Sequence, residues 1–187
     1  MRALNALVAT VSTPLAAPVV AVARLRGGNA GSARGAATLV AEAIGIARTA
    51  GARGIIVVRA DSTDYAAALV AACRRAGARF SVTVRMDPQL RRPITSIDEG
   101  VWVVIRYPNP IFDDHTGEGI SDAEIAEVPY TAFAASPAHR TDGRLIVRRV
   151  KRLNPKTATQ GQGELFATYR YHAVFPDSPF PLTRAEP

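Results

Sequence analysis

The stretch GIIVVRADS, residues 54–62, decides the fold that this sequence favours. Its four consecutive branched apolar residues, 55–58, are typical of a strand buried on both faces at the centre of a parallel sheet. Asp61 follows where such a strand ends, and open α/β sheets bind their ligands at the carboxyl ends of strands. A carboxylate there can bind a hard cation, or it can cap the helix that begins near Ser62. The spacing leaves both interpretations open.

The composition is that of a folded domain with an excess of positive charge. The chain has 187 residues, of which 48% are hydrophobic and 21% charged. This length and composition suit one domain, or one core with a large insertion. Lys and Arg number 23 against 16 acidic residues, which gives a formal net charge of +7. The excess favours a polyanionic partner.

Cysteine content and hydropathy bear on the compartment. Cys73 is the only cysteine, so the chain can form neither an internal disulfide nor a cysteine metal site. This usage is typical of a reducing compartment, and we expect a cytoplasmic protein. No run of residues is long and apolar enough to span a bilayer, so we expect no membrane partner.

The first half alternates strand and helix patterns. Turn residues separate two short apolar strands, a helix with an apolar stripe, the organising strand, a second helix and a strictly alternating strand. This order, β-β-α-β-α-β, is assigned to residues 5–12, 19–26, 33–50, 54–60, 64–76 and 79–85.

The second half changes character after Met86. A short helix is predicted within residues 89–99, followed by four β runs at 102–107, 124–133, 144–153 and 169–175. We therefore predict two parts. Residues 1–86 form an α/β core, and residues 87–187 form a β-rich region.

Four phrases carry a resemblance to a known family. They are LRGGNA (residues 25–30), VRADS (58–62), FSVTVRMD (80–87) and YHAVFPDSP (171–179). In this order and spacing they closely resemble insertion-sequence transposases of the DDE superfamily, in a subgroup with a β-rich insertion. The resemblance implies an incomplete ribonuclease H-like mixed sheet with flanking helices, followed by the insertion. It also implies a role in DNA transposition, with transposon-end DNA as the partner.

The resemblance assigns chemistry to one residue. In the family two Asp and one Glu hold two Mg²⁺ ions, which activate the nucleophile and stabilise the leaving oxygen. Asp61 matches the second Asp and is therefore expected to be catalytic and a metal ligand. The first Asp and its strand have no match before residue 5, and the Glu-bearing helix would follow residue 187. We expect a piece truncated at both ends and catalytically incomplete alone.

The unmatched strand has a structural consequence. In the family it lies between the strands that match residues 5–12 and 55–58. These two strands must therefore pair directly or leave open edges, and open edges of branched apolar residues favour self-association.

A basic cluster in the third β run is the predicted DNA contact. Arg144 and Arg148 should share one face of the strand. The cluster can bind phosphates, or it can be a solvated strand face with no partner. Its members are Arg144, Arg148, Arg149, Lys151 and Arg152.

A second interpretation of the function is a stand-alone α/β module that binds a small ligand or nucleic acid without catalysis. In a flavodoxin-like version, Asp61 and the loop at residues 62–63 would contact a small anionic ligand. Flanking reading frames that encode an Asp-bearing strand and a Glu-bearing helix would favour the transposase interpretation instead.

Overall fold

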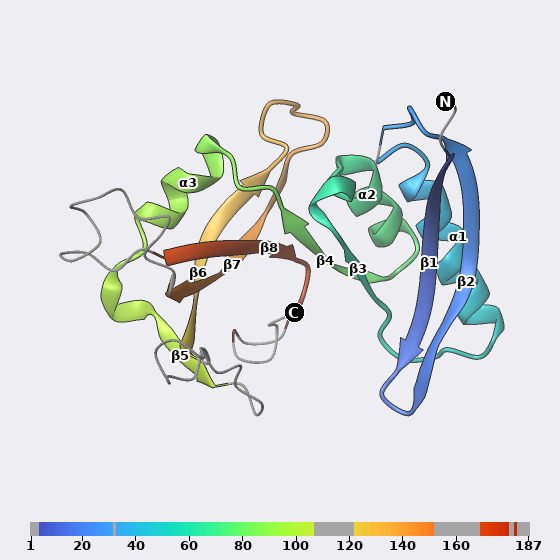
Figure 1. Ribbon diagram of the computed structural model, residues 1–187, viewed down its shortest axis with the longest axis horizontal. Coiled ribbons are helices and arrows are strands. Elements are labelled where there is room, and N and C mark those ends of the chain that lie inside the picture. The colour runs from blue at the N-terminus through green and yellow to red at the C-terminus, as the bar shows by residue number, and fades with distance from the viewer. Residues whose placement is uncertain (1–3, 32, 107–121, 152–168, 180–181, 183–187) are drawn as a thin grey trace. The chain divides into compact units, whose positions relative to one another are not determined.

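The computed structural model describes residues 4–31, 33–106, 122–151, 169–179 and 182. The chain divides into two compact units. Unit 1 comprises Met1–Thr83, Phe133–Arg140 and Pro176–Ser178, and unit 2 comprises Val84–Ala132, Thr141–Phe175 and Pro179–Pro187. The predicted α/β class is confirmed. Unit 1 contains the hairpin β1-β2 and the parallel pair β3-β4, and unit 2 contains four strands in the order β8-β7-β6-β5 (Figure 1).

Unit 1 follows the predicted order of elements. The antiparallel hairpin, the two helices and the parallel pair are β1 (Leu4–Thr13), β2 (Ala16–Gly27), α1 (Ala36–Thr49), β3 (Val57–Ala60), α2 (Ala67–Arg75) and β4 (Arg79–Val84). Helix α1 ends before Gly51, whose φ of 98° only glycine adopts readily. Local patterns of apolar residues and turn formers were therefore sufficient to place these elements.

The core of the hairpin lies on one of its faces. Val22 packs with Leu39 and Ala43 of α1, and Leu7 and Ala9 of β1 cover the same cluster. Figure 1 shows α1 running along the hairpin. The hairpin is thus held by one helix through a small apolar cluster.

The organising strand differs from its prediction. β3 covers only Val57–Ala60, and the expectation of burial on both faces is wrong. Ile55 remains 65% exposed and Val57 45% exposed. The apolar run is typical of a central strand. Among the described strands, however, β3 pairs only with β4, which lies on one side of it. Burial of both faces requires elements packed above and below the sheet, and the exposure of Ile55 and Val57 shows that they are not covered in this way.

Unit 2 contains the predicted short helix and four strands. These elements are α3 (Pro88–Thr95), a 3₁₀ turn η2 (Glu99–Val101), β5 (Val103–Arg106), β6 (Asp122–Ala132), β7 (Thr141–Lys151) and β8 (Tyr169–Pro176). Asp87 caps α3 by accepting a hydrogen bond of 2.8 Å from the Leu90 N–H. The paired strands β5–β6, β6–β7 and β7–β8 are all antiparallel. The four β runs of the second half are confirmed as strands.

Candidate metal and nucleic-acid sites

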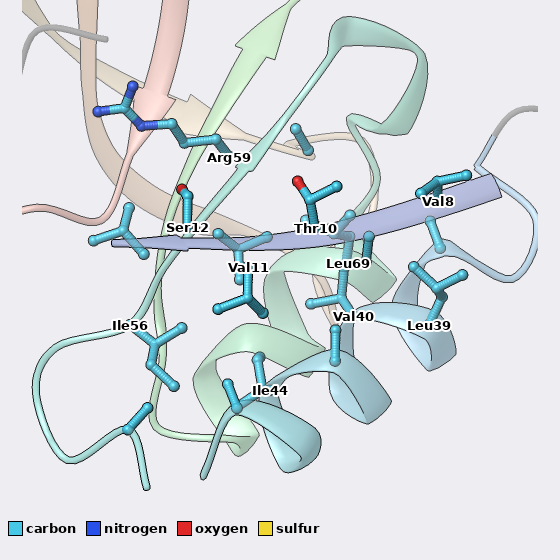
Figure 2. Close-up of a pocket in the computed structure, with 18 of the residues that line it drawn as sticks. Val8, Thr10, Val11, Ser12, Leu39, Val40, Ile44, Ile56, Arg59 and Leu69 are labelled. Atoms are coloured by element: carbon cyan, nitrogen blue, oxygen red, sulfur yellow. The ribbon is translucent and has the colours of Figure 1, made fainter. Parts of the chain in front are cut away.

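A cavity of about 630 Å³ lies in unit 1. One wall is formed by residues 7–14 of β1 and its turn, and the other by residues 54–61. Figure 2 shows Leu39, Val40 and Ile44 of α1 on one side of β1, and the hydroxyl groups of Thr10 and Ser12 on the opposite side. The cavity therefore separates β1 from β3, and these two strands do not pair with each other.

Asp61 lies directly after β3 and lines this cavity. Its carboxylate is exposed and caps the 3₁₀ turn at Ser62–Asp64, with the Ser62 N–H donating to Oδ1 at 2.6 Å. The sequence left two roles open for Asp61, a cap and a metal ligand, and the structure shows the capping hydrogen bond. Capping occupies one oxygen, so a carboxylate in this position can still bind a cation.

Asp64 is a second carboxylate at the same end of the cavity, and sequence reasoning missed it. Partial burial raises the pKa of Asp64, Arg26 acts to lower it, and the negative charge of Asp61 raises it further. Its Oδ1 is buried and has no hydrogen-bond partner among the described residues. The Asp-x-x-Asp spacing was the available signal, but it was assigned to helix capping.

Arg26 is held in place by one side chain and by the backbone. Its guanidinium donates to the Asn5 Oδ1 at 2.9 Å and to the Arg34 carbonyl at 2.7 Å. Strand β2 of the hairpin therefore supplies a positive charge that acts on Asp64.

These residues can be tested against the Mg²⁺ ions that the resemblance implies. Mg²⁺ binds through one or two carboxylates together with waters and phosphate oxygens. Asp61 and Asp64, which interact electrostatically, meet this requirement for one ion. Among the described residues no group of three or more His, Cys, Asp and Glu side chains could hold a metal. The two carboxylates therefore suit the ligand set of one Mg²⁺ ion.

The predicted DNA contact divides between the two faces of β7. Arg144 and Arg148 share one face, as expected from their spacing. Arg144 donates to Glu127 Oε2 at 2.6 Å. Arg148 lies opposite His172 of β8, with Arg170 two residues away. Burial lowers the pKa of His172, and the charges of Arg148 and then Arg170 lower it further. Positive charge therefore gathers on this face.

Arg149 lies in a different environment from the exposed one expected. Its side chain is only 4% exposed and lies between the rings of Trp102 and Tyr169, at 4.2 and 4.3 Å from their centroids. Nη1 and Nη2 donate to the two oxygens of Glu99 at 2.8 and 2.6 Å, and Nε donates to Glu124 at 2.7 Å. All three nitrogens of this buried guanidinium donate to Glu99 or Glu124. We therefore no longer include Arg149 among the residues expected to contact DNA phosphates.

The charges of this network stabilise one another. The hydrogen bonds from Arg149 lower the pKa of the Glu99 carboxyl group. Glu99 in turn raises the pKa of Arg149, against the effect of burial, and Glu124 adds to the increase. This is the expected result for a buried cation whose donors all face carboxylates.

Two members of the predicted cluster cannot be placed on either face. The side chain of Lys151 and the whole of Arg152 lie outside the described residues. Arg170 and His172 belong to the same charged face as Arg148 but were not predicted. Alternation along a strand predicts the face on which each residue lies. It does not predict which residue of the neighbouring strand lies opposite, because that depends on the register of the pairing.

Comparisons with known proteins do not assign the chain to a family. No protein-family model matches it, and no curated protein matches it significantly.

Within the described ranges, no helix has the length and apolar character needed to cross a membrane.

Proposed function

We propose that this chain is part of the catalytic domain of a DDE-type transposase and takes part in DNA transposition. The observation that carries the proposal is Asp61, an exposed carboxylate at the carboxyl end of β3 beside a cavity. The order β-β-α-β-α-β and the following antiparallel strands support it, because they agree with a ribonuclease H-like core that carries a β-rich insertion. We place this action in the cytoplasm, where the Cys73 thiol stays reduced.

Asp61 and Asp64 have distinct roles in this proposal. Asp61 holds one Mg²⁺ ion at the mouth of the cavity, where a DNA phosphate can complete the ion's oxygen shell. Asp64 is the second ligand. Burial raises the pKa of its carboxyl group, and the positive charge of Arg26 opposes that rise. When bound, the metal would polarise a phosphoryl oxygen.

The chain alone is not expected to cut DNA. In-line displacement at phosphorus with two metals requires carboxylates for both ions, and we assign Asp61 and Asp64 to a single ion. A third carboxylate must reach the site before strand cleavage can occur.

The charged face of unit 2 is proposed to bind the DNA backbone. Arg148, Arg170 and His172 lie close enough that their charges interact, and Arg144 lies on the same face of β7. Guanidinium groups suit phosphate oxygens, and the described residues include no motif that reads base edges. We expect binding that is independent of sequence and steeply dependent on salt.

Metal binding is tested with Mn²⁺ as a paramagnetic substitute for Mg²⁺. Mn²⁺ should broaden the NMR signals around Asp61 and Asp64, and Asp61→Asn should abolish the broadening. The matched control is Asp98→Asn. Asp98 is also exposed and caps a 3₁₀ turn, accepting from the Gly100 N–H at 2.7 Å, but it does not line the cavity. Equal broadening at Asp98 would show that the ion binds exposed carboxylates without selection.

DNA binding is tested by fluorescence anisotropy with a labelled duplex over a range of salt concentrations. Each lost phosphate contact should reduce the slope of log K against log salt by about 1. We therefore expect Arg148→Gln and Arg170→Gln each to reduce the slope, and Arg91→Gln on the exposed surface of α3 to leave it unchanged. Equal slopes for all three variants would remove this face from the proposal.

Nicking assays test the catalytic part. Wild-type chain with Mg²⁺ should leave a supercoiled plasmid intact. Metal-dependent nicking that Asp61→Ala abolishes would show that the chain is complete as a nuclease, contrary to the proposal.

We do not propose the flavodoxin-like alternative. That architecture requires a wholly parallel sheet. Strands β3 and β4 pair parallel, but β1–β2, β5–β6, β6–β7 and β7–β8 pair antiparallel.

A further inference from the structure

We propose that Arg59, Ser81 and Thr83 form a phosphate-binding subsite beside Asp61, which holds one phosphodiester group of a DNA strand. The inference rests on the proposed function, which assigns a metal ion to Asp61, and it adds the residues that contact the substrate. Its basis is the register of β3 and β4, which lie together in unit 1.

The first argument is that one face of the β3-β4 pair is polar toward its carboxyl end. Arg59 lies opposite Ser81 in the parallel ladder, and residues paired in this way point to the same face of a sheet. Side chains alternate along a strand, so Thr83 shares this face with Ser81. Asp61 continues the extended backbone of β3, with φ −76° and ψ 167°, and therefore shares the face with Arg59.

The second argument is the difference in burial between the two faces of this pair. Phe80, Val82 and Val84 of β4 are buried, which marks their face as the core side. The alternating residues Ser81 and Thr83 are only partly buried. Their hydroxyl groups therefore lie on the side of the sheet that a ligand can reach, and each hydroxyl can donate a hydrogen bond.

The third argument is that Arg59 is available to bind an anion. Its side chain is exposed and lines the cavity, and Figure 2 shows it on the side of β1 opposite α1. Within the part of the chain that the structure describes, Arg59 forms no hydrogen bond or ion pair. Arg79, on the same face of β4, instead pairs with Asp177 at 3.1 Å. The planar fork of a guanidinium matches two phosphate oxygens.

The spacing of these groups suits a single phosphate. Residues two apart along a strand are about 7 Å apart, and neighbouring strands are about 5 Å apart. A tetrahedral phosphate can therefore contact donors on both strands at once. The carboxylate of Asp61 would repel a bare phosphate, so a cation bound there should strengthen binding at Arg59.

The probe for this proposal is the thymidine dinucleotide, which contains one phosphodiester group. Its control carries a neutral methylphosphonate linkage in place of that group. In an amide NMR titration of the full chain with Mg²⁺, the dinucleotide should shift the signals of Arg59, Ser81 and Thr83 in a saturable manner. The methylphosphonate should shift them far less, because it lacks the charge that Arg59 binds.

Three variants test the residues of the subsite. Arg59→Gln should weaken binding of the dinucleotide about fivefold, which is the effect of losing one exposed charged contact. Thr83→Val keeps the branched shape and removes the hydroxyl, so it should weaken binding about threefold. The matched control is Arg75→Gln, which removes the same charge from an exposed position in the last turn of α2 that does not line the cavity. It should bind like the wild type.

Mn²⁺ broadening separates this subsite from the metal site. Arg59→Gln removes no oxygen ligand, so the broadening around Asp61 should persist in this variant. If it persists but Arg59→Gln and Arg75→Gln bind the dinucleotide equally, the subsite is refuted and the metal site stands. Equal binding of the dinucleotide and the methylphosphonate also refutes the subsite. If binding depends on Arg59 but not on Mg²⁺, the subsite stands and the metal role of Asp61 fails.

Discussion

Replacing Arg149 with methionine should destabilise unit 2 strongly, because it breaks a buried ion pair from one side only. Methionine keeps the apolar stem between Trp102 and Tyr169 but removes every donor. Glu124, whose side chain is 23% exposed, then loses its partner. A hydrogen bond between charged groups contributes about 1.5–3 kcal/mol. The two ring contacts contribute about 1–2 kcal/mol together, part of which the methionine sulfur restores. The expected loss is about 2–4 kcal/mol.

The matched control is Arg144→Met in the same strand. Arg144 also pairs with a glutamate at 2.6 Å, but the side chains of Arg144 and Glu127 are 25% and 45% exposed. Pairs as accessible as this one contribute about 0.2–1 kcal/mol. Both variants therefore remove a guanidinium group. The two arginines differ in the burial of their side chains and in the number of partners that are lost.

Urea unfolding followed by tryptophan fluorescence measures both variants. Trp102 is the only tryptophan in the chain and contacts Arg149, so its signal reports on this network. Adding Glu124→Gln to Arg149→Met should recover part of the loss, because the unpaired carboxylate is then removed. If Arg149→Met costs no more than Arg144→Met, the reasoning that burial sets the energy of these pairs is refuted.

Three further predictions test the described core. Gly143→Ala should cost about 1–3 kcal/mol in urea unfolding, because the new Cβ would lie 2.9 Å from the buried Phe175 ring. Burial raises the pKa of the Cys73 thiol to about 11, so DTNB at pH 8 should label it only after unfolding. His172 has its pKa lowered, so the stability it contributes above pH 6.5 should decline as pH falls through the folded pKa, and His172→Gln should remove that decline.

Local pattern accounts for the elements that were predicted correctly. The hairpin, the three helices and the four later strands follow from apolar periodicity and from turn residues within a few positions of each boundary. Strand β3 is the exception, because its apolar run gives the type of element but not its neighbours. Burial of a strand depends on which distant segments pack against the faces of its sheet, and Ile55 and Val57 remain exposed.

The candidate sites divide in the same way. Asp61 was found because its position follows from the strand before it. Asp64 was missed because its significance depends on the charge of Arg26, which comes from another element. Arg149 was misplaced because alternation assigns it a face of β7 but does not identify what covers that face.

The sequence by itself determined the order of helices and strands and the position of one carboxylate at a strand end, since both depend on residues close together in the chain. The tertiary structure alone decided that β1 and β3 both line one cavity without pairing with each other. It also decided that Arg149 is enclosed, because its partner Glu99 lies 50 residues away along the chain. Exposure and pairing are properties of contacts between distant segments, and no local pattern encodes them.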